Sequence, residues 1–357
     1  MNMLLQKYLA IVQKLIPQSE AKSLIGLDVG TNSCKAVELV RKGEKYQLVK
    51  FAVEPMVNGN PKETIKKTWD RVAASGKSPA TAVFGKGTLI RFITMPRMSL
   101  EELKSSFALE ADKYFPFPQD QIYMDCYILD NKGKDNKMSV LIAAAKKELV
   151  DARVKTLTDL GLHPEIITLN SIAVANAVSA LGYRHEAASG PKEEKPSSAA
   201  AILDMGGEVA NLTILIDNLP AFTRDIFIGS QEITKNISRN LGISLAEAEK
   251  LKFQPGDKAT EILNASDSIL MDLISEIRLS FDYFVTEKNI PVPCLLFTGG
   301  GSLLTGVRDF LAKHLEVKVI RWDPLELLEL APGVSKEDIA SQGSKLTVAL
   351  GLAFSQA

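Results

Sequence analysis

The chain has 357 residues, of which 46% are hydrophobic and 24% are charged. A chain of this length is longer than one hydrophobic core usually supports, so two domains or several interleaved subdomains are expected. The composition is typical of a folded globular protein. The 42 Lys and Arg residues nearly balance the 43 Asp and Glu residues. Bulk charge therefore gives no reason to expect nucleic acid as a partner.

The three cysteines, Cys34, Cys126 and Cys294, are far apart in the chain and form no C-x-x-C pair. This spacing argues against a zinc site and against a disulfide framework, and it fits a reducing cytoplasm. The three histidines are equally isolated. A metal site or a nucleophile centred on histidine therefore has little support.

The first 22 residues are expected to contain an amphipathic helix. Apolar residues recur at helical spacing from Leu4 to Ile16, Lys7 and Lys14 take the other face, and Pro17 ends the pattern. Two interpretations stay open, a helix at a membrane surface or partner and a helix packed on its own protein. A signal peptide is not expected, because the lysines interrupt the apolar run and no small-residue cleavage site follows.

Residues 23–185 are predicted to form a first half of mixed strands and helices. The pattern SLIGLDVG, TNSC, KAVELVRKGEKYQLVKFAVEP indicates a three-stranded meander, followed by a helix over residues 61–74 and strands in ATAVFG and TLIRFITMP. Ser99 and Glu102 have capping-box spacing ahead of a helix, and YMDCYIL and MSVLIAAA are typical strands. The amphipathic helix KKELVDARVKTLTDLG, closed by Gly161, then precedes a strand, PEIITL, and a helix, NSIAVANAVSALG.

A stretch rich in Pro, Gly, Ser and charge predicts a linker or long loop over residues 186–198. Residues 199–357 are predicted to form a second half, which opens on AAAILDMGGEVANLTILIDN. This strand, glycine turn and strand repeat the pattern that begins at Ser23, so an internal duplication is expected. Helices are predicted in SQEITKNISRNLG, in SLAEAEKLK and from about Ser266 to Glu287. The stretch PCLLFTGGGSLLTGVRDFLAKHL then predicts a strand, a glycine turn and a helix. A strand is predicted in KVIRWDP and a last helix in SKLTVALGLAFS.

Three glycine turns follow apolar strands, at residues 28–33, 204–208 and 298–302. Glycine lets the backbone approach a bulky anion and turn its N–H groups toward it. An aspartate at a strand end suits a phosphate site only if a divalent cation lies between them. We therefore expect Asp28 and Asp204 to hold Mg²⁺, largely through water, and Lys35 to supply positive charge to phosphates. One such turn alone is more typical of an ordinary hairpin, but three in two halves predict a nucleotide site.

The three turns also resemble known motifs. LDVGTNSCK and AILDMGGEVANLTI are similar to the two phosphate motifs of the actin, chaperone and sugar-kinase superfamily, and LLFTGGGSLLTGVRDFLAKHL is similar to its adenosine motif. The resemblance implies an α/β, actin-like fold of duplicated RNase H-like domains that close on ATP and Mg²⁺. It implies that these residues face the nucleotide: Gly30, Thr31, Asn32, Ser33, Lys35, Gly206 and Gly207 at the beta- and gamma-phosphates, and Gly299, Gly300, Gly301 and Ser302 toward the alpha-phosphate and sugar.

Two further sites depend on the same resemblance. The spacing of Glu249 and Lys252 is similar to a helix that contacts ribose and base, and a solvated helical face is the alternative. Many relatives carry an acidic residue at the start of the helix after PEIITL, whereas this chain has Asn170 among its residues there. An amide can orient water but brings no charge. The expected catalytic set of Asp28, Asp204 and Asn170 therefore predicts at most slow hydrolysis of ATP.

The stretch IRFITMPRMSLEELKSSFALEADKYFPFPQDQIYMDCYIL resembles the inserted subdomain of the PilM family of type IV pilus assembly proteins, placed as in the division protein FtsA. The residues that match are Pro96, Leu103, Glu110, Ala111, Tyr114, Pro116, Phe117 and Asp125. The resemblance implies an inserted subdomain over about residues 89–160, an outer subdomain over about 236–290 and a C-terminal helix that packs back on the first half.

The same resemblance implies a partner and a location. The expected partner is the cytoplasmic N-terminal peptide of a PilN-type inner-membrane protein, bound in a groove that the inserted subdomain helps to form. Other components of the pilus platform and motor are expected to follow, and self-association is a further expectation. The protein would then be cytoplasmic and held peripherally at the inner membrane through its partners.

Two other functions remain as alternatives. An FtsA-like protein that tethers the division machinery resembles a longer chain ending in a linker and a membrane helix, whereas this sequence stops at Ala357, directly after the helix that closes the fold. A small-molecule kinase of the same superfamily needs a carboxylate base beside the acceptor hydroxyl. No such base is assignable from the sequence.

Overall fold

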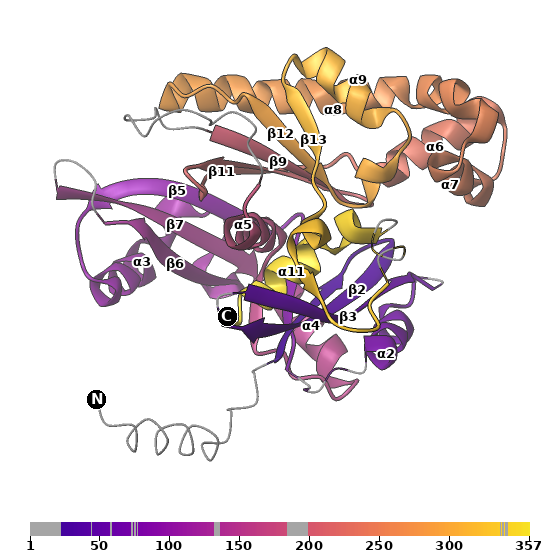
Figure 1. Ribbon diagram of the computed structural model, residues 1–357. Coiled ribbons are helices and arrows are strands. Elements are labelled where there is room, and N and C mark those ends of the chain that lie inside the picture. The colour runs from indigo at the N-terminus through magenta and orange to yellow at the C-terminus, as the bar shows by residue number, and fades with distance from the viewer. Residues whose placement is uncertain are drawn as a thin grey trace, which may run out of the picture.

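The computed structural model describes residues 23–43, 45–57, 59–72, 74, 76, 78–131, 136–183, 199–335, 337, 339 and 342–357. The helix predicted in residues 1–22 and the linker predicted over 186–198 lie outside these described residues. Within the described part, the strands form three sheets with helices packed on their faces (Figure 1).

The first sheet has six strands in the order β14-β3-β2-β1-β4-β8. Three strands form an antiparallel meander, and β4 and β8 extend it in parallel. The bounds are β1 Ser23–Val29, β2 Ser33–Lys42, β3 Lys45–Pro55, β4 Ala80–Val83, β8 Ile166–Leu169 and β14 Glu329–Leu330. Six of the seven residues of β1 are buried, as expected for a central strand covered on both faces.

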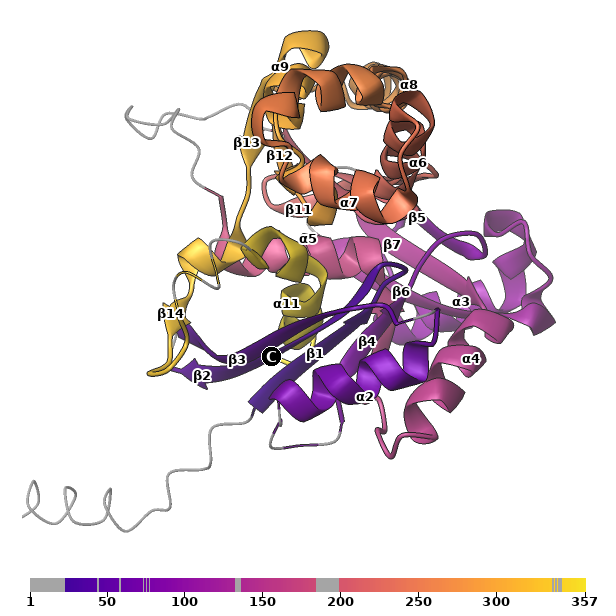
Figure 2. The ribbon, with the colours of Figure 1, turned by 90° about the vertical axis from the view of Figure 1, so that its right-hand side faces the viewer.

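Helices cover both faces of this sheet (Figure 2). Leu157 of α4 joins Ile65 of α2 in a core cluster under one face, while α11 joins the other face. The bounds are α2 Pro61–Val72, α4 Lys147–Thr158, α5 Asn170–Leu181 and α11 Thr347–Phe354. A Cβ atom on Gly351 would lie 1.7 Å from the Ala173 carbonyl oxygen. Only glycine permits α11 to approach α5 this closely.

The second sheet has five strands in the order β11-β10-β9-β12-β13. Its bounds are β9 Ala199–Met205, β10 Ala210–Ile216, β11 Leu219–Ile226, β12 Cys294–Thr298 and β13 Lys318–Arg321. An antiparallel meander is again extended by two parallel strands on the side of its first strand. Apart from β14 at the edge of the first sheet, the two sheets therefore share strand order and direction, as the predicted duplication requires.

Besides α11, the α-helices of the second half in the described residues are α6 Ser230–Leu241, α7 Leu245–Phe253, α8 Ala259–Lys288 and α9 Val307–Leu315. The long helix α8 begins earlier than the predicted start at about Ser266, because the buried side chains of Ile262 and Ala265 extend its apolar stripe toward the N-terminus. Ser244 caps α7 by accepting a hydrogen bond from the Glu247 N–H at 3.2 Å, which is one of the two bonds of a capping box.

The third sheet has three antiparallel strands in the order β5-β7-β6. Its strands are β5 Thr88–Pro96, β6 Ile122–Asp130 and β7 Lys137–Lys146, and α3 Leu100–Tyr114 packs on one face. The capping box of Ser99 and Glu102 opens α3 with both of its bonds present. This sheet lies within the region for which an inserted subdomain was predicted. The division into subdomains stays a prediction.

Candidate functional site: a cleft between two glycine turns

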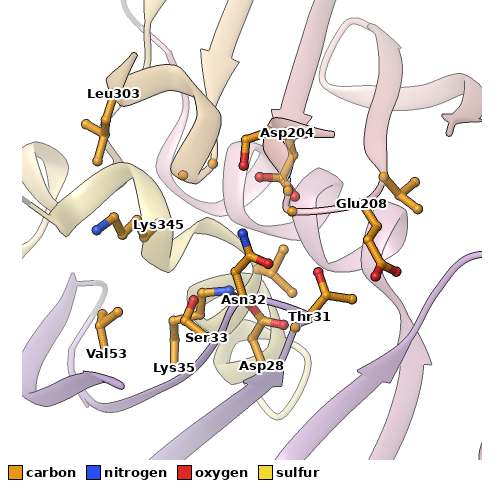
Figure 3. A pocket seen from close by; sticks show the side chains of 18 of the residues that line it. Asp28, Thr31, Asn32, Ser33, Lys35, Val53, Asp204, Glu208, Leu303 and Lys345 are labelled. Carbon is orange, nitrogen blue, oxygen red and sulfur yellow. Dashed lines mark hydrogen bonds and ion pairs between the residues drawn. The ribbon is translucent and has the colours of Figure 1, made fainter. Parts of the chain in front are cut away.

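A cleft of about 730 Å³ lies between the first and second sheets, and all three glycine turns open into it (Figure 3). Most of the residues predicted for a nucleotide site line this cleft. They are Asp28, Gly30, Thr31, Asn32, Ser33, Lys35, Asn170, Asp204, Gly206, Gly207, Glu249, Gly299 and Gly300. The size is within the range of small-molecule and cofactor pockets.

The first turn joins β1 to β2. The Gly30 N–H donates to the Ser33 carbonyl at 3.1 Å and closes the turn, and the register places Asp28 opposite Lys35. The Lys35 Nζ donates to the Asp28 Oδ2 at 2.9 Å. Burial opposes the charge of this ammonium, but the Asp28 carboxylate outweighs burial and raises the pKa of Lys35.

The second turn joins β9 to β10 and closes in the same way, with the Gly206 N–H donating to the Val209 carbonyl at 3.0 Å. Here the register places Asn211 opposite Asp204, and the Asn211 amide donates instead to Asp225 at 2.9 Å. Burial, with repulsion from Asp28, raises the pKa of Asp204 to about 7. The second turn therefore holds a carboxyl group that has no lysine opposite it.

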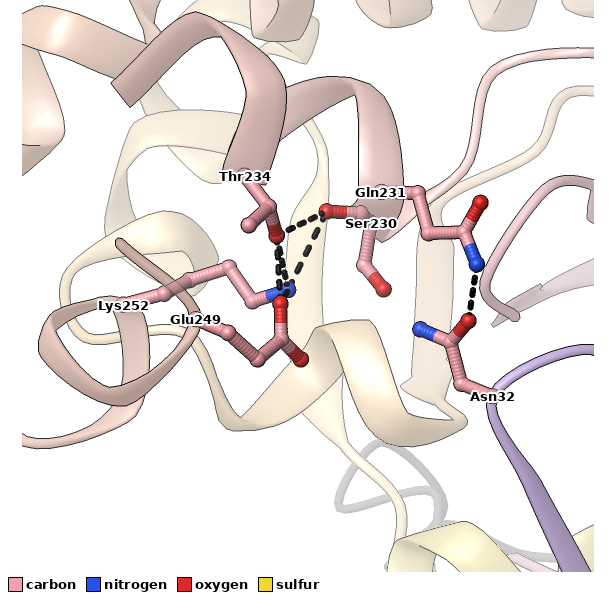
Figure 4. Close-up of polar contacts among 6 residues, drawn as sticks. All are labelled: Asn32, Ser230, Gln231, Thr234, Glu249 and Lys252. Carbon is pink, nitrogen blue, oxygen red and sulfur yellow. Dashed lines mark hydrogen bonds and ion pairs between the residues drawn. The ribbon is translucent and has the colours of Figure 1, made fainter. Parts of the chain in front are cut away.

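The turns contact each other across the cleft. A Cβ atom on Gly207 would lie 2.5 Å from the Thr31 Oγ1 and 2.7 Å from the Asn32 Oδ1. The Gln231 Nε2, at the start of α6, donates to the same Asn32 Oδ1 (Figure 4). A larger residue at Gly207 would displace these two side chains, so the glycine lets the two halves meet at their phosphate-type turns.

The third turn follows β12 and lies against the second. Gly299 has a φ of +82°, and a Cβ atom there would lie 2.4 Å from the Asp204 Oδ1. Gly301 and Ser302 lie behind the turn instead of on the cleft wall: a Cβ atom on Gly301 would meet the Met205 side chain, and the Ser302 Oγ donates to the Gly299 carbonyl at 2.7 Å. These two residues shape the turn.

Glu249 and Lys252, for which the sequence left open contact with ribose and base or a solvated helical face, lie next to each other (Figure 4). The Glu249 side chain is 42% exposed and lines the cleft, whereas the Lys252 side chain is fully buried. The Lys252 Nζ donates to the Ser230 carbonyl at 3.1 Å, to the Thr234 Oγ1 at 2.7 Å and to Glu249 at 2.6 Å. Burial lowers the pKa of Lys252. Through these hydrogen bonds the buried Lys252 ammonium holds the Glu249 carboxylate and the first turn of α6 in position.

Asn170 is the first residue of α5 and lies on the cleft wall. Its Oδ1 is buried, and within the described residues it has no hydrogen-bond partner. A buried acceptor without a partner costs free energy. This atom is therefore available to a water molecule or ligand in the cleft.

The sequence did not predict Lys345, which lines the cleft from the helical turn η6 Gly343–Leu346. The Ser344 carbonyl accepts the Gly299 N–H at 3.0 Å and fixes η6 against the third turn. Burial, with repulsion from Lys35, lowers the pKa of Lys345. No local motif marks this lysine, because only tertiary packing brings it to the site. Other lining residues that the sequence missed include Val53, Phe84, Glu208, Asn211, Asp225, Phe253, Gln254, Leu303 and Gln342.

The donor set fits a phosphate-bound cation better than a metal held by protein alone. No group of three or more His, Cys, Asp or Glu residues that would hold a metal ion occurs in the part of the chain that the structure describes. Mg²⁺ commonly binds one or two carboxylates and completes its coordination with water and phosphate oxygens. Asp28 and Asp204 at one cleft, beside glycine backbones, match that arrangement.

A second cavity, of about 280 Å³, lies between the third sheet and the β8–α5 segment. Consecutive residues of β6 (123–127) and β8 (167–169) line it, and each of these strands is at the edge of its sheet in the described part of the chain. The rest of the lining is mostly small or aliphatic, namely Val83, Leu141, Ala143, Ala144, Ala145, Val150 and Ile172. We call this cavity the strand-edge groove.

Comparison with known proteins identifies the family. The family model described as type IV pilus assembly protein PilM matches residues 26–357. The chain belongs to this PilM family. A solved structure of a PilM–PilN type IV pilus biogenesis complex is similar, with a TM-score of 0.79 and 25% identity over 95% of this chain and 99% of that one. The PilM resemblance and the actin-like fold predicted from the sequence are thereby confirmed.

More distant proteins share less with the chain. The ethanolamine utilization protein EutJ from Carboxydothermus hydrogenoformans shares the fold at a TM-score of 0.51 and 13% identity, covering 99% of this chain and 98% of that one. The cell division protein FtsA of Helicobacter pylori is 26% identical over 133 residues, which are 37% of this chain. The PilM-family chain spans only 25% of the length of that protein.

The FtsA of Neisseria meningitidis is 23% identical over 259 residues, covering 62% of this chain and 60% of that protein.

Within the residues described here, no helix combines the length and apolar character that crossing a membrane requires.

Proposed function

We propose that this PilM-family chain is an ATP-binding scaffold for the inner-membrane platform of a type IV pilus. One Mg²⁺-ATP would brace its two halves, and the strand-edge groove would capture the cytoplasmic N-terminal peptide of a PilN-type membrane protein. The observation that supports this proposal best is that glycine turns from both halves open into one cleft of about 730 Å³.

At the phosphates, the first turn would provide backbone N–H groups, the hydroxyls of Thr31 and Ser33 and the ammonium of Lys35. Asp28 and Asp204 would hold Mg²⁺, mainly through water. Bound Mg²⁺ would neutralise phosphate charge and favour the ionised form of Asp204, whose pKa is raised to about 7 in its absence. The second turn, at Gly206 and Gly207, would complete the enclosure.

At the nucleoside, Glu249 would accept hydrogen bonds from ribose hydroxyls. Lys252 fixes its carboxylate from behind, so little side-chain entropy remains to be lost on binding. The Gly299 and Gly300 backbones would approach the alpha-phosphate and sugar, and Lys345 adds a cation on the same wall.

Hydrolysis is proposed to be slow at most. Asn170 is the polar residue at the start of α5 that would orient an attacking water, but an amide brings no negative charge. We therefore assign the nucleotide a mainly structural role, in which it favours the closed arrangement of the two halves.

The partner proposal rests on the shape of the strand-edge groove. In the described part of the chain, two strands at sheet edges line a mostly apolar cavity, which suits an extended peptide that adds to a sheet edge. The similar solved structure is of a PilM–PilN complex, and we propose a PilN-type peptide as the ligand here. Binding it would hold this chain at the cytoplasmic face of the inner membrane, where other platform and motor components would assemble.

A groove-blocking variant tests the partner proposal. Ala143→Glu places a charge among the apolar residues of the groove and should abolish binding of a labelled PilN-type peptide, while Mg²⁺-ATP still binds. Leu109→Glu is the matched control, because Leu109 on α3 is 86% exposed and does not line the groove. Fluorescence anisotropy measures the peptide affinity, and circular dichroism checks that each variant is folded. Wild-type peptide affinity in folded Ala143→Glu would exclude the groove.

An FtsA-like division role is the second candidate, because the Neisseria meningitidis relative matches 62% of this chain. Capture on this protein from detergent-solubilised inner membrane separates the two functions. Recovery of a membrane protein with a short cytoplasmic tail supports the pilus platform. Recovery of division-ring components favours the alternative.

A further inference from the structure

The nucleotide cleft and the strand-edge groove share a wall. Strands β4 and β8 pair in parallel, with Val83 opposite Leu169. Val83 and Leu169 line the groove, and the next residue of each segment, Phe84 and Asn170, lines the cleft. Each segment therefore passes from one cavity to the other within a single residue.

Asn170 lies where this wall becomes a helix. It is the first residue of α5, and the described residues provide no side-chain hydrogen bond to cap that helix. Packing holds the segment instead. Leu169, directly before Asn170, and Ile172, two residues after it, both line the groove and belong to a small apolar cluster with Val83 and Ala145. A ligand in the groove would press directly on the residues that set the position of the Asn170 amide.

The loop after β4 makes a second connection. It leads from the first sheet into β5 of the groove-forming sheet, and it also contacts the second half. The Lys86 Nζ lies 5.6 Å from the centre of the Phe227 ring, and a backbone hydrogen bond from Gly85 reaches Asp225 on the cleft wall. A shift of the groove-forming sheet would therefore also move residues that contact the second half.

We infer that occupancy of the groove by an extended apolar peptide raises the affinity of the cleft for Mg²⁺-ATP, with Asn170 as the positioning residue. The inference rests on the proposed function, because it takes the ligands of both cavities from it. Groove occupancy fixes the start of α5 and so holds the unpartnered Oδ1 of Asn170 in place for the water and phosphates in the cleft. By thermodynamic linkage, Mg²⁺-ATP must raise the peptide affinity by the same factor.

Four dissociation constants test the inference. The affinity for Mg²⁺-ATP is measured by calorimetry with and without saturating peptide, and the affinity for peptide is measured with and without saturating Mg²⁺-ATP. The probe is a synthetic peptide of the cytoplasmic N-terminus of the PilN-type protein from the same organism. We expect each ligand to tighten the other about fivefold or more, by equal factors.

The variant Asn170→Ala tests whether the coupling between the groove and the cleft depends on the Asn170 side chain. Whatever this substitution does to the nucleotide affinity itself, the ratio of affinities with and without peptide should fall to about one. Asn176→Ala is the matched control on the same helix: the Asn176 Nδ2 donates to the Ser355 Oγ at 3.0 Å and lines neither cavity. It should keep the full ratio.

The outcomes separate this inference from the proposed function. If both ligands bind the wild type but neither changes the affinity of the other, the coupling is wrong and the proposed function stands. If Asn170→Ala keeps the full ratio, the coupling is real and Asn170 is not its route. If either ligand fails to bind the wild type, the proposed function is contradicted and the inference falls with it.

Discussion

The β1–β2 and β9–β10 hairpins have the same turn but opposite electrostatic roles. In each, a glycine N–H closes the turn on the carbonyl three residues later, and an aspartate is the last residue but one of the first strand. Opposite that aspartate stands Lys35 in the first hairpin and Asn211 in the second. The Asp28 charge is therefore compensated within its own hairpin, and the Asp204 charge is not.

This difference indicates a division of labour within a duplicated frame. The first hairpin presents a carboxylate and an ammonium side by side, which suits contact with both phosphate and cation. The second presents a carboxyl group whose pKa is raised to about 7, so that ionisation is favoured when a cation arrives. One backbone pattern thus supplies two chemistries through a single cross-strand position.

Removing the lysine of the first hairpin should have the largest effect. Lys35→Met leaves the buried Asp28 carboxylate without its partner and should lower the free energy of unfolding by about 3 kcal/mol, measured by urea denaturation. The double variant Lys35→Met, Asp28→Asn should recover most of the loss. Lys235→Met, which removes an exposed pair with Glu232, should leave the free energy of unfolding nearly unchanged. Full stability of Lys35→Met would refute the compensated pair.

Removing the carboxyl group of the second hairpin should act on ligand binding. Asp204→Ala should weaken Mg²⁺-dependent ATP binding tenfold or more, on the order of 1.4 kcal/mol, with little change when EDTA removes the metal. Asp267→Ala, at an exposed position of α8, is the control. Calorimetry at pH 8 measures both. An unchanged dissociation constant in folded Asp204→Ala would refute the metal assignment.

The pH dependence of Mg²⁺-ATP binding should report the ionisation of Asp204. Because the pKa of Asp204 is about 7 without metal and the cation needs the ionised form, Mg²⁺-ATP binding should strengthen up to about tenfold between pH 6 and pH 8. Asp204→Asn should remove most of this dependence, and the slope that remains in the variant reports the titration of ATP itself. An equally steep profile in Asp204→Asn would contradict the prediction.

The same pKa also bears on the stability of the ligand-free protein. A folded-state pKa above the unfolded value means that the folded chain binds the proton more tightly. The Asp204 contribution to stability should therefore fall as the pH rises from about 4 to 7. Asp204→Asn should remove that slope from urea denaturation measured across this window.

The smallest expected effect concerns the contact between the two turns. Gln231→Leu removes the hydrogen bond to Asn32 that joins the halves, and it should weaken ATP binding about threefold, in keeping with the net contribution of one hydrogen bond. Gln121 is exposed and lies directly before β6. Gln121→Leu is therefore the control and should leave the ATP affinity unchanged. Equal affinities for the two variants would mean that this bond does not help to close the cleft.

The sequence predicted those features that depend on neighbouring residues. Strand, glycine and aspartate patterns identified all three turns, and the spacing of Ser99 and Glu102 identified a capping box that the structure contains. The repeat of strand and turn in the two halves predicted the shared sheet topology. Local patterns sufficed because each of these features forms within a few residues of chain.

Local sequence patterns could not predict the features that tertiary packing sets. The spacing of Glu249 and Lys252 places both on one face of a helix, but only the packing of α6 decides that Lys252 is buried and Glu249 exposed. Lys345 reaches the cleft because the Ser344 carbonyl binds the Gly299 N–H, a contact between residues far apart in sequence. The strand-edge groove likewise depends on where two sheets meet.

Crystals grown with a non-hydrolysable ATP analogue and Mn²⁺ in place of Mg²⁺ would test the central claim most directly. The account predicts an anomalous Mn²⁺ peak in the cleft near Asp28 and Asp204, with the phosphates contacted by the turns of both halves. A cleft without nucleotide at saturating concentration, or a nucleotide contacted by one half alone, would contradict it.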